Sequence, residues 1–132
     1  MAEELLGCWK LVSSDNFDGY LKELGVNMAT RMFVGTLKPE VHICKNGDKW
    51  SIKTVSSFQT TDVCFKLNEE FSEITPDKRK CKITVTLDNN GLKETQKWDD
   101  KETTITRTVE NGQMITICKC GDVTCRRVYT RA

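Results

Sequence analysis

The chain lacks an excess of charge of either sign and lacks long apolar runs. Lysine and arginine number 20 and aspartate and glutamate 19, so the overall field does not attract nucleic acid. No stretch approaches the ~18 consecutive apolar residues of a membrane span. Residues 1–6 have neither the basic region nor the apolar region of a secretion signal. The sequence therefore predicts a cytosolic protein that does not bind nucleic acid.

Histidine, the commonest general base of enzymes, is almost absent. The single histidine, His42, lies in the alternating segment 41–44, where an exposed strand position is its simplest interpretation. No second histidine stands near it, and no histidine follows or precedes a serine closely enough in sequence to suggest a nucleophile with its base. The serines considered are Ser13, Ser14, Ser56 and Ser57. An enzyme acting on a lipid is the less favoured hypothesis, and no catalytic residue is expected.

The cysteines exclude two further kinds of site. Seven cysteines in a chain without a secretion signal do not indicate a disulfide scaffold, and the odd number agrees. They are dispersed and contain no CxxC pair, so a structural zinc site is not expected. The sequence predicts neither a metal nor another cofactor.

What the chain does have is a long series of alternating segments. Its 132 residues predict one domain, 1–132. From about Lys38 onward, short segments that alternate apolar and polar residues are separated by turn signals every eight to twelve residues. The alternation is sharpest over 80–87. Eight or nine such segments, with one more at 7–13, predict an all-β fold: a ten-stranded antiparallel up-and-down barrel, closed to remove its edges.

One stretch, about 16–36, has helical periodicity instead. Apolar residues fall on one helical face at Phe17, Tyr20, Leu21 and Leu24. Asp15 or Asn16 can cap the start of this helix, and Gly25 suits its end. A second short helix is expected over 27–35. Because a helical hairpin inserted between the first two strands adds little core to a closed barrel, we expect a helix-turn-helix lid over the barrel mouth.

Two arginines occupy strand faces that should be apolar. Arg127 and Tyr129 share a face with Val123 and Cys125, because side chains alternate along a strand. Arg107 likewise lies between Ile105 and Val109. A side chain that bends to solvent at a strand end could explain one such arginine. Two arginines with a tyrosine favour an interior site for an anion, and a carboxylate suits such donors.

An apolar cavity with these donors suits a long-chain carboxylate. Ten strands leave room for one small ligand inside a barrel. Burial of about fourteen methylenes contributes roughly 11 kcal/mol before the cost of immobilisation, so micromolar to nanomolar dissociation constants follow.

Short segments spread along the whole chain also match a known family. They are Gly7–Leu11, Asn16–Leu21, Leu24–Val26, Phe65–Leu67, Glu70–Phe71, Trp98–Asp99 and Arg127–Tyr129. In them the chain resembles the intracellular lipid-binding proteins, most closely the heart, adipocyte, myelin and epidermal branch of the fatty-acid-binding proteins. The resemblance implies a ten-stranded calycin-like (lipocalin-like) barrel with a helix-turn-helix lid. It implies a non-enzymatic intracellular carrier that binds one long-chain fatty acid for solubilisation and transport.

The resemblance also implies roles for single residues. The family's carboxylate site maps onto Arg107, Arg127 and Tyr129, and the portal phenylalanine onto Phe58. The cavity-lining positions of the branch map onto Phe17, Tyr20, Met28 and Pro39. Retinoic-acid-binding relatives share the two arginines and the tyrosine, so a retinoic-acid carrier is the alternative. Retinol-binding relatives have glutamines in place of the arginines, which argues for an acidic ligand.

The sequence also bears on partners and location. A cytoplasmic monomer is expected, and Lys22, Arg31 and Lys38 near the lid would form a basic collar for transient contact with anionic membranes. Lys22 and Arg31 match part of a basic cluster that the adipocyte-type proteins use for nuclear import. Met32 stands where a third basic residue of that cluster is common. Location in the nucleus and a nuclear receptor as partner are therefore left open.

A thiol pair is the last feature that the resemblance implies. If Gly121 and Asp122 form a two-residue turn, Cys118 and Cys125 lie opposite each other on the inward face. Epidermal-type members resemble this arrangement and can join the two cysteines. Two free thiols in a reducing cytosol are the favoured alternative.

Overall fold

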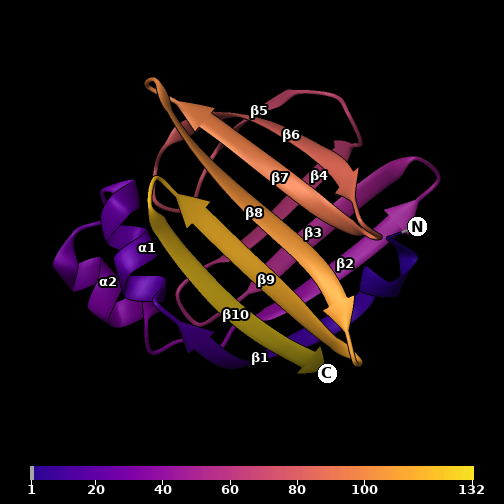
Figure 1. Ribbon diagram of the computed structural model, residues 1–132, viewed down its shortest axis with the longest axis horizontal. Coiled ribbons are helices and arrows are strands. Elements are labelled where there is room, and N and C mark those ends of the chain that lie inside the picture. Colours follow the sequence, from indigo (N-terminus) through magenta and orange to yellow (C-terminus); the bar gives the residue numbers. More distant parts are fainter. Residues whose placement is uncertain (1) are drawn as a thin grey trace.

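The computed structural model describes residues 2–132, which form one ten-stranded antiparallel sheet with two helices at one end (Figure 1). The strands are β1 Gly7–Asp15, β2 Glu40–Asn46, β3 Lys49–Val55, β4 Thr60–Lys66, β5 Phe71–Ile74, β6 Lys80–Asp88, β7 Gly91–Trp98, β8 Lys101–Glu110, β9 Gln113–Cys120 and β10 Val123–Arg131. A short 3-10 helix, η1, covers Glu3–Leu5. The sequence-based prediction of a ten-stranded all-β barrel is therefore confirmed.

The sheet closes by pairing its first strand with its last. Strands that follow each other in sequence are hydrogen-bonded neighbours, with one exception: β4 and β5 do not pair and form the two ends of the sheet. The first strand, β1, pairs with the last, β10. The rings of Phe65 and Phe71 stack across this gap, with centroids 6.0 Å apart. The barrel is nearly closed, and side chains rather than ladder hydrogen bonds cover its opening.

The inward-facing side chains of strands around the barrel fill its interior. The largest fully buried side chains include Trp9, Ile43, Trp50, Leu92 and Met114, which come from five different strands. Because each strand turns every second side chain inward, polar residues at these inward positions face the interior as well. The same rule that builds the core therefore positions the polar groups described below.

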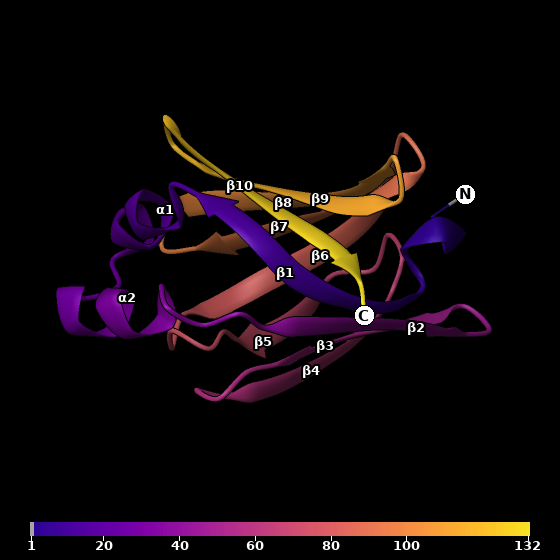
Figure 2. The ribbon, with the colours of Figure 1, turned by 90° about the horizontal axis from the view of Figure 1, so that it is seen from below.

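The helices α1 (Phe17–Leu24) and α2 (Met28–Val34) form the expected hairpin at one end of the barrel (Figure 2). Gly25 ends α1 with φ +97°, as expected. The expected side-chain cap at the start of α1 is wrong: Asn16 is the capping residue, but its amide donates to the carbonyl of Thr124 on β10. Within residues 2–132, no helix is long and apolar enough to cross a bilayer.

Candidate functional site

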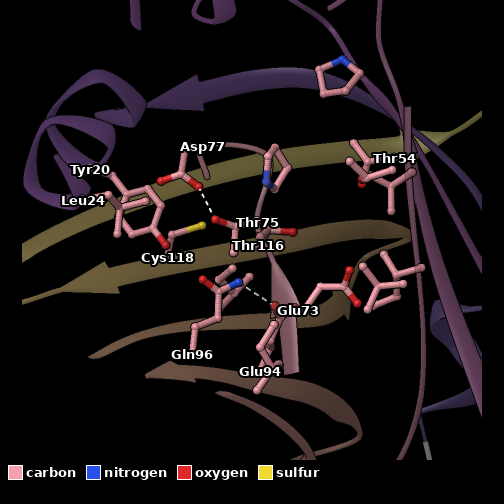
Figure 3. A pocket seen from close by; sticks show the side chains of 18 of the residues that line it. Tyr20, Leu24, Thr54, Glu73, Thr75, Asp77, Glu94, Gln96, Thr116 and Cys118 are labelled. Atoms are coloured by element: carbon pink, nitrogen blue, oxygen red, sulfur yellow. Dashed lines mark hydrogen bonds between the residues drawn. The ribbon is translucent and has the colours of Figure 1, made fainter. Parts of the chain in front are cut away.

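A cavity of about 350 Å³ lies inside the barrel beneath the helices. Most of the wall area is apolar, and polar and charged side chains, among them Asp77, Glu94 and Gln96, reach into the cavity (Figure 3). Apolar lining residues include Phe17, Leu24, Val41, Ile52, Phe65, Ile83, Val85, Ile105 and Met114. A cavity of this size with a mainly apolar wall and convergent polar groups has the general form of a small-molecule site.

Arg127 is the most unusual group in the cavity wall. Arg127 is 7% exposed, and its guanidinium lies 3.8 Å from the centre of the Phe17 ring. Nη1 donates to Oγ of Ser14 at 3.0 Å, and Nε donates to the Tyr129 hydroxyl at 3.5 Å. Within residues 2–132 no carboxylate forms an ion pair with it. A desolvated cation without a counterion is costly, so this site favours an anion.

Strand register places a second polar group between the two arginines. Thr116 on β9 is directly opposite Arg107 on β8 and opposite Arg127 on β10. Its hydroxyl is buried and has no hydrogen-bond partner among the described residues. Buried polar groups are nearly always satisfied, so this hydroxyl is free to bind a ligand. Thr116 was not predicted from the sequence, where it has the character of an ordinary strand threonine.

Arg107, the other predicted arginine, already has an internal partner. Its Nη1 lies 3.1 Å from Oε1 of Glu94 on β7, and the two side chains are 14% and 15% exposed. Oε2 of Glu94 accepts a hydrogen bond from Gln96 at 2.7 Å. The two arginines therefore differ: one is neutralised by the protein and the other is not. Their sequence patterns alone do not distinguish them, because each arginine shares a strand face with apolar residues.

The expected cavity and portal residues are divided between the wall and the surface. Phe17, Tyr20 and Pro39 line the cavity. Met28 is 65% exposed and lies outside the lining. Phe58 is 43% exposed and packs edge-on against Phe33 of α2, with ring centroids 5.5 Å apart. The pair lies where α2 meets the 56–59 loop, so the structure places Phe58 beside the lid rather than in the cavity wall.

Comparison with known proteins places this architecture in a family. The model of the lipocalin / cytosolic fatty-acid binding protein family matches residues 6–132. The adipocyte fatty acid-binding protein of Pygoscelis papua is 51% identical over 132 residues, which is 100% of each chain. Fatty acid-binding protein 9 of Homo sapiens is 49% identical over 131 residues, 99% of each chain. The chain belongs to the lipocalin / cytosolic fatty-acid binding protein family.

The family is one of carriers, so this member is not an enzyme. A solved structure supports the same placement. The fatty acid binding protein of Schistosoma mansoni in complex with arachidonic acid is 39% identical, with a TM-score of 0.95 and coverage of 99% of this chain and 98% of that one. The resemblance drawn from short sequence segments is therefore confirmed over the whole fold.

In this family member the polar wall continues away from Glu94 toward the lid. Arg79 donates to the amide oxygen of Gln96 at 3.0 Å and holds both carboxylate oxygens of Asp77. Thr75 also donates to Asp77, at 2.6 Å (Figure 3). The guanidinium of Arg79 lies 4.4 Å from the centre of the Trp98 ring. Arg79, like Arg107, therefore has an internal carboxylate.

The same contacts lower the pKa of Asp77. Burial opposes ionisation of the carboxyl group, but the hydrogen bonds from Arg79 and Thr75 and the charge of Arg79 outweigh it. The carboxylate is consequently ionised in the folded protein over the whole physiological pH range.

Asp77→Asn is expected to lower the free energy of unfolding by about 2 kcal/mol at pH 7, because Arg79 loses its counterion. A lowered folded-state pKa means that acid protonates the unfolded chain first, so stability falls as pH falls. The difference in unfolding free energy between wild type and D77N should have its full value at pH values above 3.8, the ordinary pKa of the group, and should shrink at lower pH. Urea unfolding at pH 7, 5 and 3 measures this, with Glu110→Gln, an exposed carboxylate, as control. A difference that stays constant down to pH 3 would contradict it.

The basic residues expected to form a collar around the lid are not equivalent. Lys22 and Lys38 are exposed. The Arg31 side chain is only 12% exposed, because Nε binds Asp18 at 2.9 Å and Nη1 donates to the carbonyl of Val26 at 2.7 Å. Arg31 therefore links α1 to α2 and does not contribute a free surface charge.

Cys118 and Cys125 lie directly opposite each other on β9 and β10, and both are buried free thiols. A hydrogen bond between the thiols raises the pKa of Cys118, which burial raises further, and lowers the pKa of Cys125. Cys118 also lines the cavity. Two free thiols, the favoured interpretation of the sequence, stay the prediction for this pair.

Proposed function

We propose that the chain carries one long-chain fatty acid inside the barrel, with the carboxylate held by Arg127 and Tyr129. Arg107, the third residue of the predicted set, lines the same cavity, but its charge is already met by Glu94. The observation that carries the proposal is the state of Arg127, which is 7% exposed in a mainly apolar cavity and lacks a carboxylate partner within residues 2–132. A ligand carboxylate supplies that missing charge, and its alkyl chain covers the apolar wall. The names of the relatives, which are fatty acid-binding proteins, support the same ligand class.

The test is a calorimetric titration of the delipidated protein with oleate. Burial of an alkyl chain contributes about 0.8 kcal/mol per methylene, so we expect one site per chain and a dissociation constant below about 1 μM. Retinoic acid, the alternative ligand, should bind more weakly than oleate. Oleyl alcohol should also bind more weakly, since it cannot neutralise Arg127. Absence of saturable oleate binding would exclude the carrier function.

Thr116→Val is expected to weaken oleate binding by about threefold to tenfold, because a neutral hydrogen bond contributes on the order of 1 kcal/mol. The substitution keeps the shape of the side chain and removes a buried hydroxyl without a partner, so the free energy of unfolding should not fall. Calorimetry and urea unfolding measure the two effects.

The matched control for Thr116→Val is Thr103→Val on β8. The Thr103 hydroxyl bonds to Tyr20 and to the carbonyl of Lys119, both at 2.7 Å. Thr103→Val should therefore lower stability by about 1–2 kcal/mol. If Thr116→Val lowers stability as much and leaves oleate affinity unchanged, the hydroxyl is structural and not a ligand donor.

We also propose that the lid makes transient contact with anionic membranes. The support is the exposure of Met28 (65%), Met32 (68%) and Phe33 (50%) on α2, with Lys22 and Lys38 exposed on either side of it in sequence. Faster transfer of oleate to anionic than to neutral vesicles, suppressed by salt, would support this contact. Equal rates would exclude it.

A further inference from the structure

Within residues 2–132, Glu94 is the one acidic side chain in the cavity wall that forms an ion pair with a predicted carboxylate-binding arginine. It reaches inward from β7 and receives Nη1 of Arg107 at 3.1 Å on one oxygen and Gln96 at 2.7 Å on the other. With only 15% exposure it is poorly solvated. A carboxylate held in this way lies where a ligand carboxylate would approach Arg107.

Within residues 2–132, one of the arginines that line the cavity has no carboxylate partner. Three arginines line it: Arg79, Arg107 and Arg127. Arg79 is paired with Asp77 at 2.6 Å and Arg107 with Glu94 at 3.1 Å. Within the described residues, Arg127 alone among the three has no carboxylate. Glu73, the remaining carboxylate of the lining, is exposed to solvent, so water screens its charge. Among the buried groups of the lining, the interior therefore has room for one further negative charge.

We propose that Glu94 is a specificity-determining residue: it neutralises Arg107 from inside and so restricts the ligand head group to a single negative charge at Arg127. This inference rests on the proposed function and adds a charge limit to it. The selected ligands are long-chain monoanions. Long-chain dianions, such as alkyl phosphate monoesters, are rejected because their second charge meets Glu94 instead of a free arginine.

The physical reason is the weak screening of charges in the cavity. A ligand charge near Arg127 feels repulsion from Glu94 that water reduces little, so Glu94 weakens binding of every anion and weakens binding of dianions most. A neutral head group is unaffected. Glutamine at position 94 keeps an oxygen for the hydrogen bond from Gln96 while removing the charge.

The experiment titrates wild type and Glu94→Gln with three ligands of equal chain length: hexadecanol, palmitate and hexadecyl phosphate. E94Q should bind palmitate about fivefold more tightly and hexadecyl phosphate about twentyfold more tightly, with hexadecanol unchanged. Glu102→Gln is the matched control, because it removes the same charge at an exposed position on β8. If E94Q changes all three affinities equally, or none, the charge limit is wrong.

A double-mutant cycle with Arg107→Gln tests the pairing itself. R107Q alone should weaken palmitate binding by about tenfold, because it leaves Glu94 as an unpaired buried anion. The E94Q/R107Q double variant should return to within about threefold of wild type, because the site at Arg127 is intact. A double variant as weak as R107Q would show that Arg107 binds the ligand directly and that Glu94 is incidental.

The unfolding free energies of the same four proteins separate this inference from the proposed function. If the wild type binds no palmitate, the carrier function fails. The pairing of Glu94 with Arg107 is then still measured by the cycle, because the two substitutions should be non-additive in stability. Additive effects on unfolding would overturn the pairing whatever the ligand.

Discussion

Replacing Arg127 by glutamine should weaken oleate binding by roughly 30-fold to 100-fold, which corresponds to the loss of a charged hydrogen-bond partner of about 2–3 kcal/mol. The same change should leave the free energy of unfolding unchanged or slightly increased. In the ligand-free protein Arg127 is a desolvated cation with no carboxylate partner within residues 2–132, so its removal relieves a cost. Opposite effects on binding and stability identify a residue that is kept for the ligand and not for the fold.

The neighbouring residue provides a matched control. Arg126 lies next to Arg127 on β10 but is exposed on the outer face. Arg126→Gln makes the same change of charge and should leave both oleate affinity and stability within about 0.5 kcal/mol of wild type. Calorimetry with oleate and urea unfolding, applied to both variants, measure the difference. If R127Q binds oleate as tightly as R126Q does, Arg127 does not hold the carboxylate.

The fold could be predicted from the sequence because one signal repeats along it. Period-two alternation between turn signals indicates strands, and strands of this number close into a barrel. The gap between β4 and β5 could not be predicted, because residues 67–70 have the same turn character as the connections between paired strands. Alternation shows which face a side chain takes, but it does not show whether a neighbouring strand is hydrogen-bonded.

The candidate site was only partly predictable for a related reason. Alternation places Arg107 and Arg127 inward, but the difference between them depends on a contact with another strand. The signal for Glu94 was present: it shares its face of β7 with Leu92 and Gln96, so it had to be an inward carboxylate. A tight turn at 99–100 places β7 beside β8, which brings Glu94 near Arg107. Thr116 gave no comparable signal, because threonine is common in strands.

Gly91→Ala should lower the free energy of unfolding by about 3 kcal/mol, the second large effect expected in this chain. Gly91 begins β7 after the turn, and its position is buried. A Cβ there would collide with the carbonyl oxygen of Arg107 and approach Cγ2 of Thr108 to 2.7 Å. Because a strand backbone cannot move aside as a flexible side chain can, the substitution must separate β7 from β8 beside the arginine that Glu94 neutralises.

A second glycine separates this collision from ordinary backbone strain. Gly112, in the turn between β8 and β9, has φ +77°, and a Cβ there would meet no atom of the described residues within 4 Å. Gly112→Ala should therefore cost only about 1 kcal/mol, the usual penalty of a left-handed conformation for an L-residue. Urea unfolding of both variants gives the comparison. Since the larger loss at Gly91 comes from the approach of β7 to β8, it should be accompanied by changed backbone amide chemical shifts at Arg107 and Thr108, whereas Gly112→Ala should leave those two residues unchanged. Equal losses at the two glycines would mean that the strands tolerate separation at this point.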